Sequence, residues 1–338
     1  MNGWMQIYQS KLTTAEKAVR SIRGGLRLFL TGNCSVPQRV MSALVEYAPN
    51  FDPPIEIVQV LTVGSADYVA PGMEKYIRVN TMFISANVRQ AVNEGRADFT
   101  PVFLSEIPGL FRNRVVPLDA ALIQVSPPDE HGFCSFGVEV GVTKTAAETA
   151  RIVIAEVNDR MPRTLGDSFV HVSKLTHIVP VSYQLPEHRM GDIAEVERKI
   201  GYLCASLIED GSTMQMGIGG IPDAVLTFLG DKKDLGIHTE LFSDGVIDLV
   251  DRGIINGERK TLHPGKIVAT SQEVDAVIAD AGATFKQTKR APRSTASARP
   301  GTYPGHPCRA SLARRWIAPQ SIRRKPCGRQ PQNRHKYA

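Results

Sequence analysis

Residues 214–250 read MQMGIGGIPDAVLTFLGDKKDLGIHTELFSDGVIDLV, which predicts a strand, a glycine turn, a helix, a second strand and a second helix. The first apolar run ends in the turn GIGG at residues 217–220, and the second, residues 236–242, carries His238 and Glu240. Successive strand residues point to opposite faces, so these two side chains share a face. A carboxylate near the carboxyl end of one strand then lies beside a glycine turn, at the edge where open α/β sheets bind ligands.

Spacing alone leaves three interpretations of this stretch open. Gly217 and Gly219, followed by an acid about twenty residues later, resemble a dinucleotide-binding fingerprint, but its third glycine would fall at Pro222. His238 and Glu240 could hold a metal, although no further His or Cys stands at ligand spacing, and the zinc-deaminase pattern H-x-E lacks its later P-C-x-x-C. The third interpretation is an ordinary β–α turn beside a solvated glutamate.

The stretch, continued by TLHPGK at residues 261–266, resembles the acetyl-CoA hydrolase/transferase family, which contains class I CoA-transferases of the 4-hydroxybutyrate CoA-transferase type. Three further segments resemble the family: SPPDEHG at residues 126–132, AEVN at residues 155–158 and GDS at residues 166–168. The similarity extends from about residue 15 to residue 270. It is a long match, and therefore more specific than a single short motif.

The resemblance implies an active site. In the family the glutamate of the segment H-[ST]-E-[ML]-x-S-D-G is the nucleophile, so Glu240 is expected to form a glutamyl-CoA thioester. The glycine loop of the family lines the CoA site, and the corresponding residues are Gly217, Ile218, Gly219, Gly220 and Ile221. The implied activity moves CoA between a short-chain acyl-CoA such as acetyl-CoA and a carboxylate such as 4-hydroxybutyrate or acetate.

The same resemblance sets the expected partners. If water intercepts the intermediates, the site hydrolyses acetyl-CoA, which is the alternative activity. CoA is then a substrate, and no metal or permanently bound cofactor is expected. Intact members of the family are expected to be homo-oligomers.

Charge divides the chain into two parts. Of 40 Lys and Arg residues, 14 lie in residues 281–338, which contain no Asp or Glu. Residues 1–280 therefore hold 26 basic and 34 acidic residues, a net charge of −8. The basic part contains one leucine and no valine, so it cannot build an apolar core.

Three interpretations of this basic part compete. It is a basic arm that binds nucleic acid, a flexible extension without a partner, or an out-of-frame translation of a lost half-domain. We favour the third, because the composition changes abruptly after a segment that resembles the family. The alternative to an active transferase is then an inactive, truncated remnant with a nucleic-acid-binding tail. An active transferase is not expected to bind nucleic acid.

Strands that alternate with helices predict an α/β fold with two open, mostly parallel sheet domains. The first domain is expected at residues 1–185 and a partial second domain at residues 192–280. Residues 281–338 are expected to form a basic, disordered tail. The second domain is expected to be incomplete, since the similarity stops at about residue 270 and family members continue.

Local patterns predict individual elements. A helix is expected at residues 38–47, and strands are expected at residues 81–84 and 120–125. A longer amphipathic helix, residues 193–209, is expected to begin after a cap at Asp192. One apolar stripe should bury this helix, formed by Val196, Ile200, Leu203 and Leu207.

Three other groups are candidates for chemistry. Cys34 follows the first predicted strand and is expected to be a small buried residue rather than a nucleophile. The SPPDEHG loop offers acid–base groups and is expected on the substrate side of the site. Glu156 ends a strand, which makes it the rival of Glu240 for the nucleophile by position alone.

The cysteines and the apolar runs bear on location. Five cysteines occur without paired spacing, which is typical of a reduced chain. No run of about 18 apolar residues and no basic-then-apolar signal peptide are found, so a cytoplasmic location without a membrane span is expected.

Overall fold

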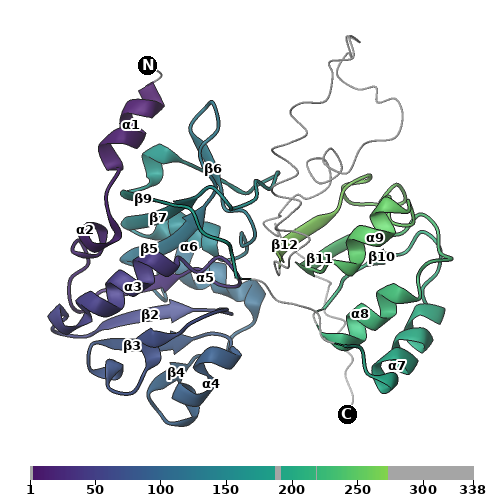
Figure 1. The fold of residues 1–338 in the computed structure, drawn as a ribbon, viewed down its shortest axis with the longest axis horizontal. Helices are drawn as coiled ribbons and strands as arrows, with labels where there is room; N and C mark the ends of the chain where they lie inside the picture. Colours follow the sequence, from purple (N-terminus) through teal and green to yellow (C-terminus); the bar gives the residue numbers. More distant parts are fainter. Residues whose placement is uncertain (1–2, 187–191, 218, 273–338) are drawn as a thin grey trace, which may run out of the picture.

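The computed structural model describes residues 3–186, 192–217 and 219–272, and its largest sheet has seven strands (Figure 1). The strand order is β4-β3-β2-β1-β5-β7-β9, and every neighbouring pair is parallel. This architecture confirms the predicted α/β class. The strands are β1 (Arg27–Leu30), β2 (Ile55–Gln59), β3 (Ile77–Thr81), β4 (Ala97–Phe99), β5 (Ala120–Val125), β7 (Ile152–Asn158) and β9 (His177–Val181).

Helices cover both faces of this sheet, because the central strands are apolar on both faces. In β1, Leu28 and Leu30 pack in one buried core with α2 and α3, whereas Phe29 packs in another with α5 and α6. The rings of Phe29 and Phe111 meet edge to face, with centroids 5.7 Å apart. The helices of this part are α1 (Gly3–Lys11), α2 (Ala15–Val19), α3 (Gln38–Tyr47), α4 (Ala86–Asn93), α5 (Ile107–Arg112) and α6 (Thr143–Thr149).

The strand order reverses between β1 and β5. The chain lays β1 to β4 on one side of this point and β5, β7 and β9 on the other. The loop after β1 contains Asn33, whose φ of 48° lies in the left-handed region. The amide of Asn33 donates to the carbonyl of Leu61 in the loop after β2, at 2.5 Å. Loops that diverge at such a point leave a crevice at the carboxyl edge of the sheet, where a ligand binds.

A smaller parallel sheet follows in the chain, with strand order β10-β11-β12. Its strands are β10 (Thr213–Met214), β11 (Gly236–Phe242) and β12 (Val268–Gln272), and its helices are α7 (Glu195–Ser206), α8 (Gly220–Thr227) and α9 (Gly245–Asp251). A short antiparallel pair, β6 (Phe133–Ser135) and β8 (Phe169–His171), lies beside the larger sheet.

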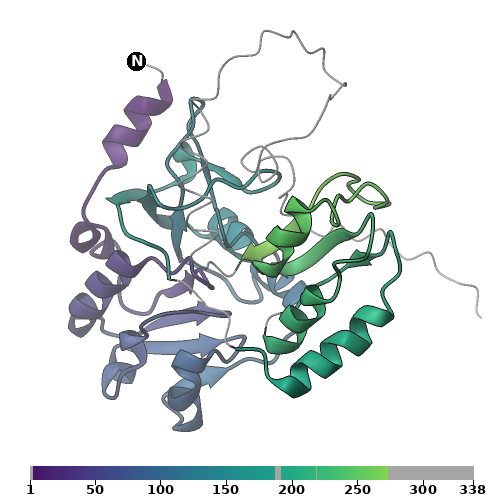
Figure 2. The ribbon, with the colours of Figure 1, turned by 45° about the vertical axis from the view of Figure 1, so that its right-hand side comes forward.

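The two sheets share one apolar core. Cys34 and Val138, from the part of the chain that forms the larger sheet, belong to the same buried cluster as Met214, Met216 and Ile237. Figure 2 shows the smaller sheet and its helices directly beside the carboxyl-edge loops of the larger one. Because the cluster is continuous, the two sheets are held in a defined relation to each other.

The strand predicted at residues 81–84 is wrong in position. The observed strand β3 ends at Thr81, and its buried residues Ile77, Val79 and Thr81 alternate with half-buried ones. The apolar residues Met82 and Phe83 follow the strand and belong to the loop that leads to α4. Their apolar character imitates a strand, whereas the alternation that marks the true strand lies just upstream.

The helix predicted at residues 193–209 exists but is shorter and differently capped. It begins at Glu195, so Asp192 is not its cap. Ala194 precedes the helix, and the carboxylate of Glu197 accepts a hydrogen bond from its amide at 2.7 Å. A glutamate at the third helical position thus satisfies an orphan N–H of the first turn without an N-cap side chain.

The expected burial of the apolar stripe on α7 is also wrong. Val196, Leu203 and Leu207 are 67%, 63% and 83% exposed. The helix packs against α8 through Gly201 instead, where a Cβ atom would lie 2.7 Å from the backbone of Ala224. Periodicity finds an apolar stripe, but it does not say whether the chain supplies a surface to cover it.

Some expectations lie outside the described residues. These are Ile218 of the glycine turn and the basic segment at residues 281–338. The expected domain boundaries stay predictions. Of the helices in the described part of the chain, none combines the length and apolar character needed to cross a bilayer.

Candidate active site

A cavity of about 820 Å³ lies between the two sheets, at the carboxyl edge of the larger one. Gly32 and Asn33 after β1 and Leu61 after β2 belong to its wall on the larger-sheet side. Strand β11 contributes the wall on the smaller-sheet side. A volume of several hundred Å³ with a few polar groups is typical of a small-molecule site. The cavity therefore lies at the sheet edge where the reversal of strand order predicts a ligand site.

Glu240 and His238 both line this cavity, as their shared strand face predicts. Glu240 is exposed towards the cavity, yet the surrounding protein removes part of its hydration and raises the pKa of its carboxyl group. Burial lowers the pKa of His238, and the positive charges of Lys260 and His263 lower it further. A basic carboxylate beside an imidazole that stays neutral near pH 7 can act as a nucleophile or a general base.

A buried lysine joins β11 to the TLHPGK segment that follows it. The Nζ atom of Lys260 donates to the carbonyls of Ile237 and Lys266, at 2.7 and 2.6 Å. Burial lowers the pKa of Lys260 to about 8. The ring centroid of His263, in the same segment, lies 6.3 Å from that of His238. Two of the segments that carry the family resemblance, strand β11 and TLHPGK, thus lie side by side.

The chain that leads into the glycine turn pairs with the strand that carries Glu240. The parallel register of β10 and β11 pairs Met214 with Ile237, and Gly217 and Glu240 each follow three residues after these partners. Thr239 supports this register, because its hydroxyl accepts from the amide of Met216 at 2.9 Å and lies 2.9 Å from the carbonyl of the same residue. Gln215, two residues before the turn, lines the cavity.

The residues predicted to contact CoA do not themselves line the cavity where they are described. Gly217, Gly219 and Ile221 are exposed, and Gly220 is half-buried. Ile218 lies outside the described residues. The contact of this turn with CoA therefore stays a prediction.

Asn33 and Glu139 form a buried polar pair in the cavity wall. The Nδ2 atom of Asn33 donates to Oε2 of Glu139, and both residues are 5% exposed. The buried Oδ1 atom of Asn33 accepts no hydrogen bond from any described residue. A Cβ atom on Gly141 would lie 2.8 Å from Oε1 of Glu139, so the glycine makes room for this carboxyl. Cys34, the neighbour of Asn33, is fully buried, as predicted.

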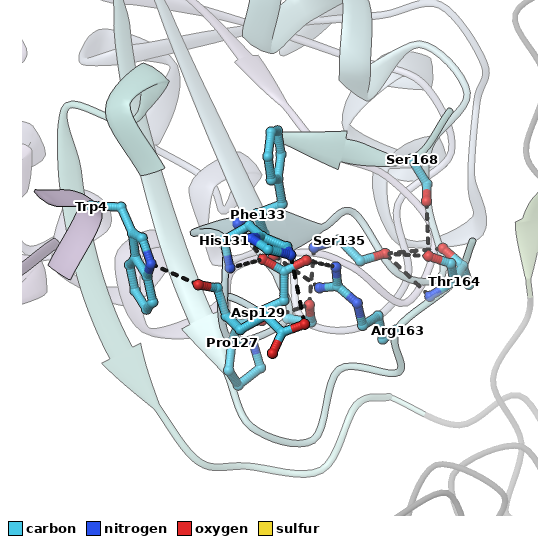
Figure 3. Close-up of polar contacts among 11 residues, drawn as sticks. Trp4, Pro127, Asp129, His131, Phe133, Ser135, Arg163, Thr164 and Ser168 are labelled. Atoms are coloured by element: carbon cyan, nitrogen blue, oxygen red, sulfur yellow. Dashed lines mark hydrogen bonds and ion pairs between the residues drawn. The ribbon is translucent and has the colours of Figure 1, made fainter. Parts of the chain in front are cut away.

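The SPPDEHG loop is not among the residues that line this cavity, and its expected position on the substrate side stays a prediction. Asp129 accepts hydrogen bonds from the amides of His131 and Phe133 at 2.9 Å, and Arg163 donates to its other oxygen at 2.6 Å (Figure 3). Trp4 of α1 donates to the carbonyl of Glu130 at 2.9 Å. These contacts hold the loop against β6 and α1.

Glu156, the rival nucleophile, is completely buried and does not line the cavity. It accepts a hydrogen bond from the amide of Val40 at 2.6 Å and another from the hydroxyl of Tyr183. Tyr183 also accepts from Gln124 at 3.0 Å and from the amide of Gln38 at 3.1 Å. Burial raises the pKa of Glu156 to about 7 against these hydrogen bonds. Its role is to tie α3 and Tyr183 to the sheet.

Three site residues had not been predicted: Asn33, Glu139 and Thr239. The position of Asn33 directly after the first strand was a usable signal, because the carboxyl ends of parallel strands gather at one edge. Glu139 belongs to a segment without regular structure and gave no signal. Within residues 3–186, 192–217 and 219–272, no group of three or more His, Cys, Asp or Glu side chains is arranged to hold a metal ion.

Comparison of the sequence with known proteins identifies relatives of this chain. Residues 3–186 match the model of the acetyl-CoA hydrolase/transferase N-terminal domain. A 4-hydroxybutyrate coenzyme A transferase of Clostridium kluyveri is 52% identical over 79% of this chain and 62% of its own length. A succinyl-CoA:acetate/propanoyl-CoA:succinate CoA transferase of Fasciola hepatica is 45% identical over 74% of this chain and 52% of its own length.

A solved structure extends the similarity to the backbone. The crystal structure of a 4-hydroxybutyrate CoA-transferase from Porphyromonas gingivalis superposes with a TM-score of 0.71 and 39% identity. The superposition covers 82% of this chain and 66% of that one. The chain thus spans between about half and two thirds of the length of these relatives.

Proposed function

The chain belongs to the acetyl-CoA hydrolase/transferase family, and from this premise we propose that it transfers CoA between a short-chain acyl-CoA and a carboxylate. The observation that carries the proposal is Glu240, whose partly desolvated carboxyl lines the cavity between the two sheets. Reduced hydration makes a carboxylate more basic, and a covalent carboxylate intermediate divides one difficult transfer into easier steps. Acetyl-CoA is the expected acyl donor, with 4-hydroxybutyrate or acetate as the acid.

The proposed chemistry begins at Glu240. Its carboxylate attacks the thioester carbonyl, which forms an acyl–glutamyl anhydride and releases the CoA thiolate. The thiolate then attacks the glutamyl carbonyl, which forms a glutamyl-CoA thioester and releases the first acid as its carboxylate. A second carboxylate attacks the glutamyl-CoA thioester and passes through the same two steps in reverse. It leaves as the new acyl-CoA and restores the Glu240 carboxylate.

The surroundings of Glu240 support these roles. The amides of a glycine turn can hold the negative oxygen of a tetrahedral intermediate, and glycine lets a thioester approach the backbone. The pairing of β10 with β11, and the contact of Met216 with Thr239 just before Glu240, support this assignment to the turn at residues 217–220. A neutral His238 adds no positive charge that would lower the basicity of the neighbouring Glu240 carboxylate.

Covalent labelling tests the proposal. The full chain is incubated with acetyl-CoA, treated with borohydride, digested and analysed by mass spectrometry. We expect a CoA adduct before borohydride treatment, and the reduced alcohol after it, on the peptide that contains Glu240. Glu240→Gln should lose both products completely.

The matched control is Glu258→Gln, which changes an exposed carboxylate in the same part of the chain. This variant should label as the wild type does. A folded wild type that forms no adduct, or a Glu240→Gln variant that still forms one, would refute the proposal. Steady release of free CoA without an added acid would identify hydrolysis by the same intermediate.

A further inference from the structure

The chain that leaves the larger sheet towards the smaller one is anchored at Tyr183. This residue follows the end of β9, and the side chain of Asn158, at the end of β7, donates to its carbonyl at 2.9 Å. Two positions later, Leu185 is buried in the core that the two sheets share. Tyr183 therefore lies where the connection between the sheets is still fixed to the larger one.

The hydroxyl of Tyr183 joins three elements of the larger-sheet part. It donates to the carboxylate of Glu156 on β7. It accepts from the amide of Gln38, the first residue of α3, at 3.1 Å and from the side chain of Gln124 on β5 at 3.0 Å. Burial and the negative charge of Glu156 raise the pKa of this hydroxyl, so it keeps its proton. Its one donor and two acceptor positions are all used, and a fully satisfied polar network of this kind is rigid.

The same network fixes the connection from β1 to α3, residues 32–38. The side chain of Gln124 donates to the carbonyl of Val36 at 3.1 Å as well as to Tyr183. The end of this connection is thus held both directly, at the first amide of α3, and through Gln124. Its beginning, residues 32 and 33, lines the cavity on the larger-sheet side, whereas β11 with Glu240 lines the other side. A shift of the Tyr183 hydroxyl therefore reaches the wall of the cavity.

We propose that Tyr183 is a positioning residue of the active site, whose hydroxyl fixes residues 32–38 and so sets the cavity wall that faces the strand of Glu240. The inference rests on the proposed transfer at Glu240. Tyr183 does not itself line the cavity, so it acts through this wall. Reacting atoms have to be held about 3–3.5 Å apart, and a misplacement of about 1 Å can cost about a hundredfold in rate.

Tyr183→Phe tests the inference, because it keeps the ring and removes the hydroxyl alone. The rate of CoA adduct formation on Glu240 is measured in single turnovers over a range of acetyl-CoA concentrations, with the fold checked by circular dichroism. We expect the maximal rate to fall at least about tenfold, while the acetyl-CoA concentration that gives half this rate changes less than about threefold. A purely structural hydroxyl would lower the urea midpoint and leave the maximal rate unchanged, and this result would overturn the inference.

Hydrogen exchange followed by mass spectrometry reports on the wall without any reaction. In Tyr183→Phe the amide of Gln38 loses its acceptor, so the peptide with residues 32–38 should exchange at least about fivefold faster. Unchanged exchange in this peptide would contradict the role of the hydroxyl. Tyr202→Phe is the matched control, since this tyrosine on α7 is 60% exposed, and it should keep the wild-type rate and exchange.

A second variant tests whether one network carries the effect. Gln124→Met removes the side chain that links the hydroxyl to the carbonyl of Val36, and it should change the rate and the exchange in the same direction. The two substitutions share a partner, so their effects on the maximal rate should be smaller together than their sum. Additive effects would refute a shared network.

The two measurements separate the failure of this inference from the failure of the proposed function. A wild type that forms no adduct refutes the transfer, and the exchange data then decide alone whether Tyr183 fixes the wall. An adduct that forms at the wild-type maximal rate in Tyr183→Phe keeps the transfer and refutes the positioning role.

Discussion

Replacing Glu156 with glutamine is expected to remove a large pH dependence from the stability of the fold. The carboxyl is completely buried, and the amide of Val40 and the hydroxyl of Tyr183 donate to it. Glutamine has nearly the same shape and keeps one acceptor oxygen, but it does not titrate. The variant therefore isolates the effect of the buried charge from the effect of packing.

The magnitude follows from the pKa. Burial raises the pKa of Glu156 from 4.5 to about 7, so between these pH values the folded chain binds a proton that the unfolded chain has released. The contribution of Glu156 to stability is therefore greatest below pH 4.5 and is lost as the pH rises through 7. At 1.36 kcal/mol for each tenfold change in proton affinity, the loss amounts to about 3 kcal/mol.

Urea denaturation of the wild type and of Glu156→Gln at pH 5 and pH 8 measures this loss. Other groups titrate in both proteins, so the informative quantity is the difference between their two pH dependences. The wild type should lose about 2.5 kcal/mol more than the variant between the two pH values, because part of the full loss has already occurred at pH 5. Glu46→Gln, an exposed substitution on α3, should behave as the wild type. Equal pH dependences for wild type and Glu156→Gln would refute the reasoning.

Two further predictions concern strand β11. Thr239→Val leaves the amide of Met216 without its acceptor and should lower the free energy of unfolding by about 1–3 kcal/mol in urea titrations, whereas Thr239→Ser should restore most of it. Lys260→Met removes a positive charge that lowers the pKa of His238, so this pKa should rise towards 6.5. Histidine titration by NMR measures this pKa. An unchanged value would show that the charge of Lys260 does not affect the pKa of His238.

Elements with strong periodicity were predictable from the sequence. Helix α3 at Gln38–Tyr47, strand β5 at Ala120–Val125 and strand β11 at Gly236–Phe242 have their predicted bounds. Each has an apolar pattern that local backbone geometry converts directly into one buried face or two. The exposed stripe of α7 marks the limit of this reasoning, because burial depends on a partner surface and not on the helix alone.

Of the candidate site, only the residues on strand β11 could be predicted from the sequence. Glu240 and His238 share a face because of the two-residue period of a strand, and both line the cavity. Asn33 and Glu139 are 106 residues apart, and their hydrogen bond arises only when two loops meet over the sheet. No local pattern encodes such a pair. The left-handed conformation of Asn33, with φ of 48°, is likewise set by its tertiary surroundings.

Substitutions in the core shared by the two sheets can alter the wall of the cavity. Cys34 and Val138 lie in that core, and each is the immediate chain neighbour of a residue in the cavity wall, Asn33 or Glu139. A change of volume at either core position therefore shifts a wall residue without touching the substrate. The shape of the cavity can thus change through substitutions in the apolar interior, while the strand that carries Glu240 keeps its sequence.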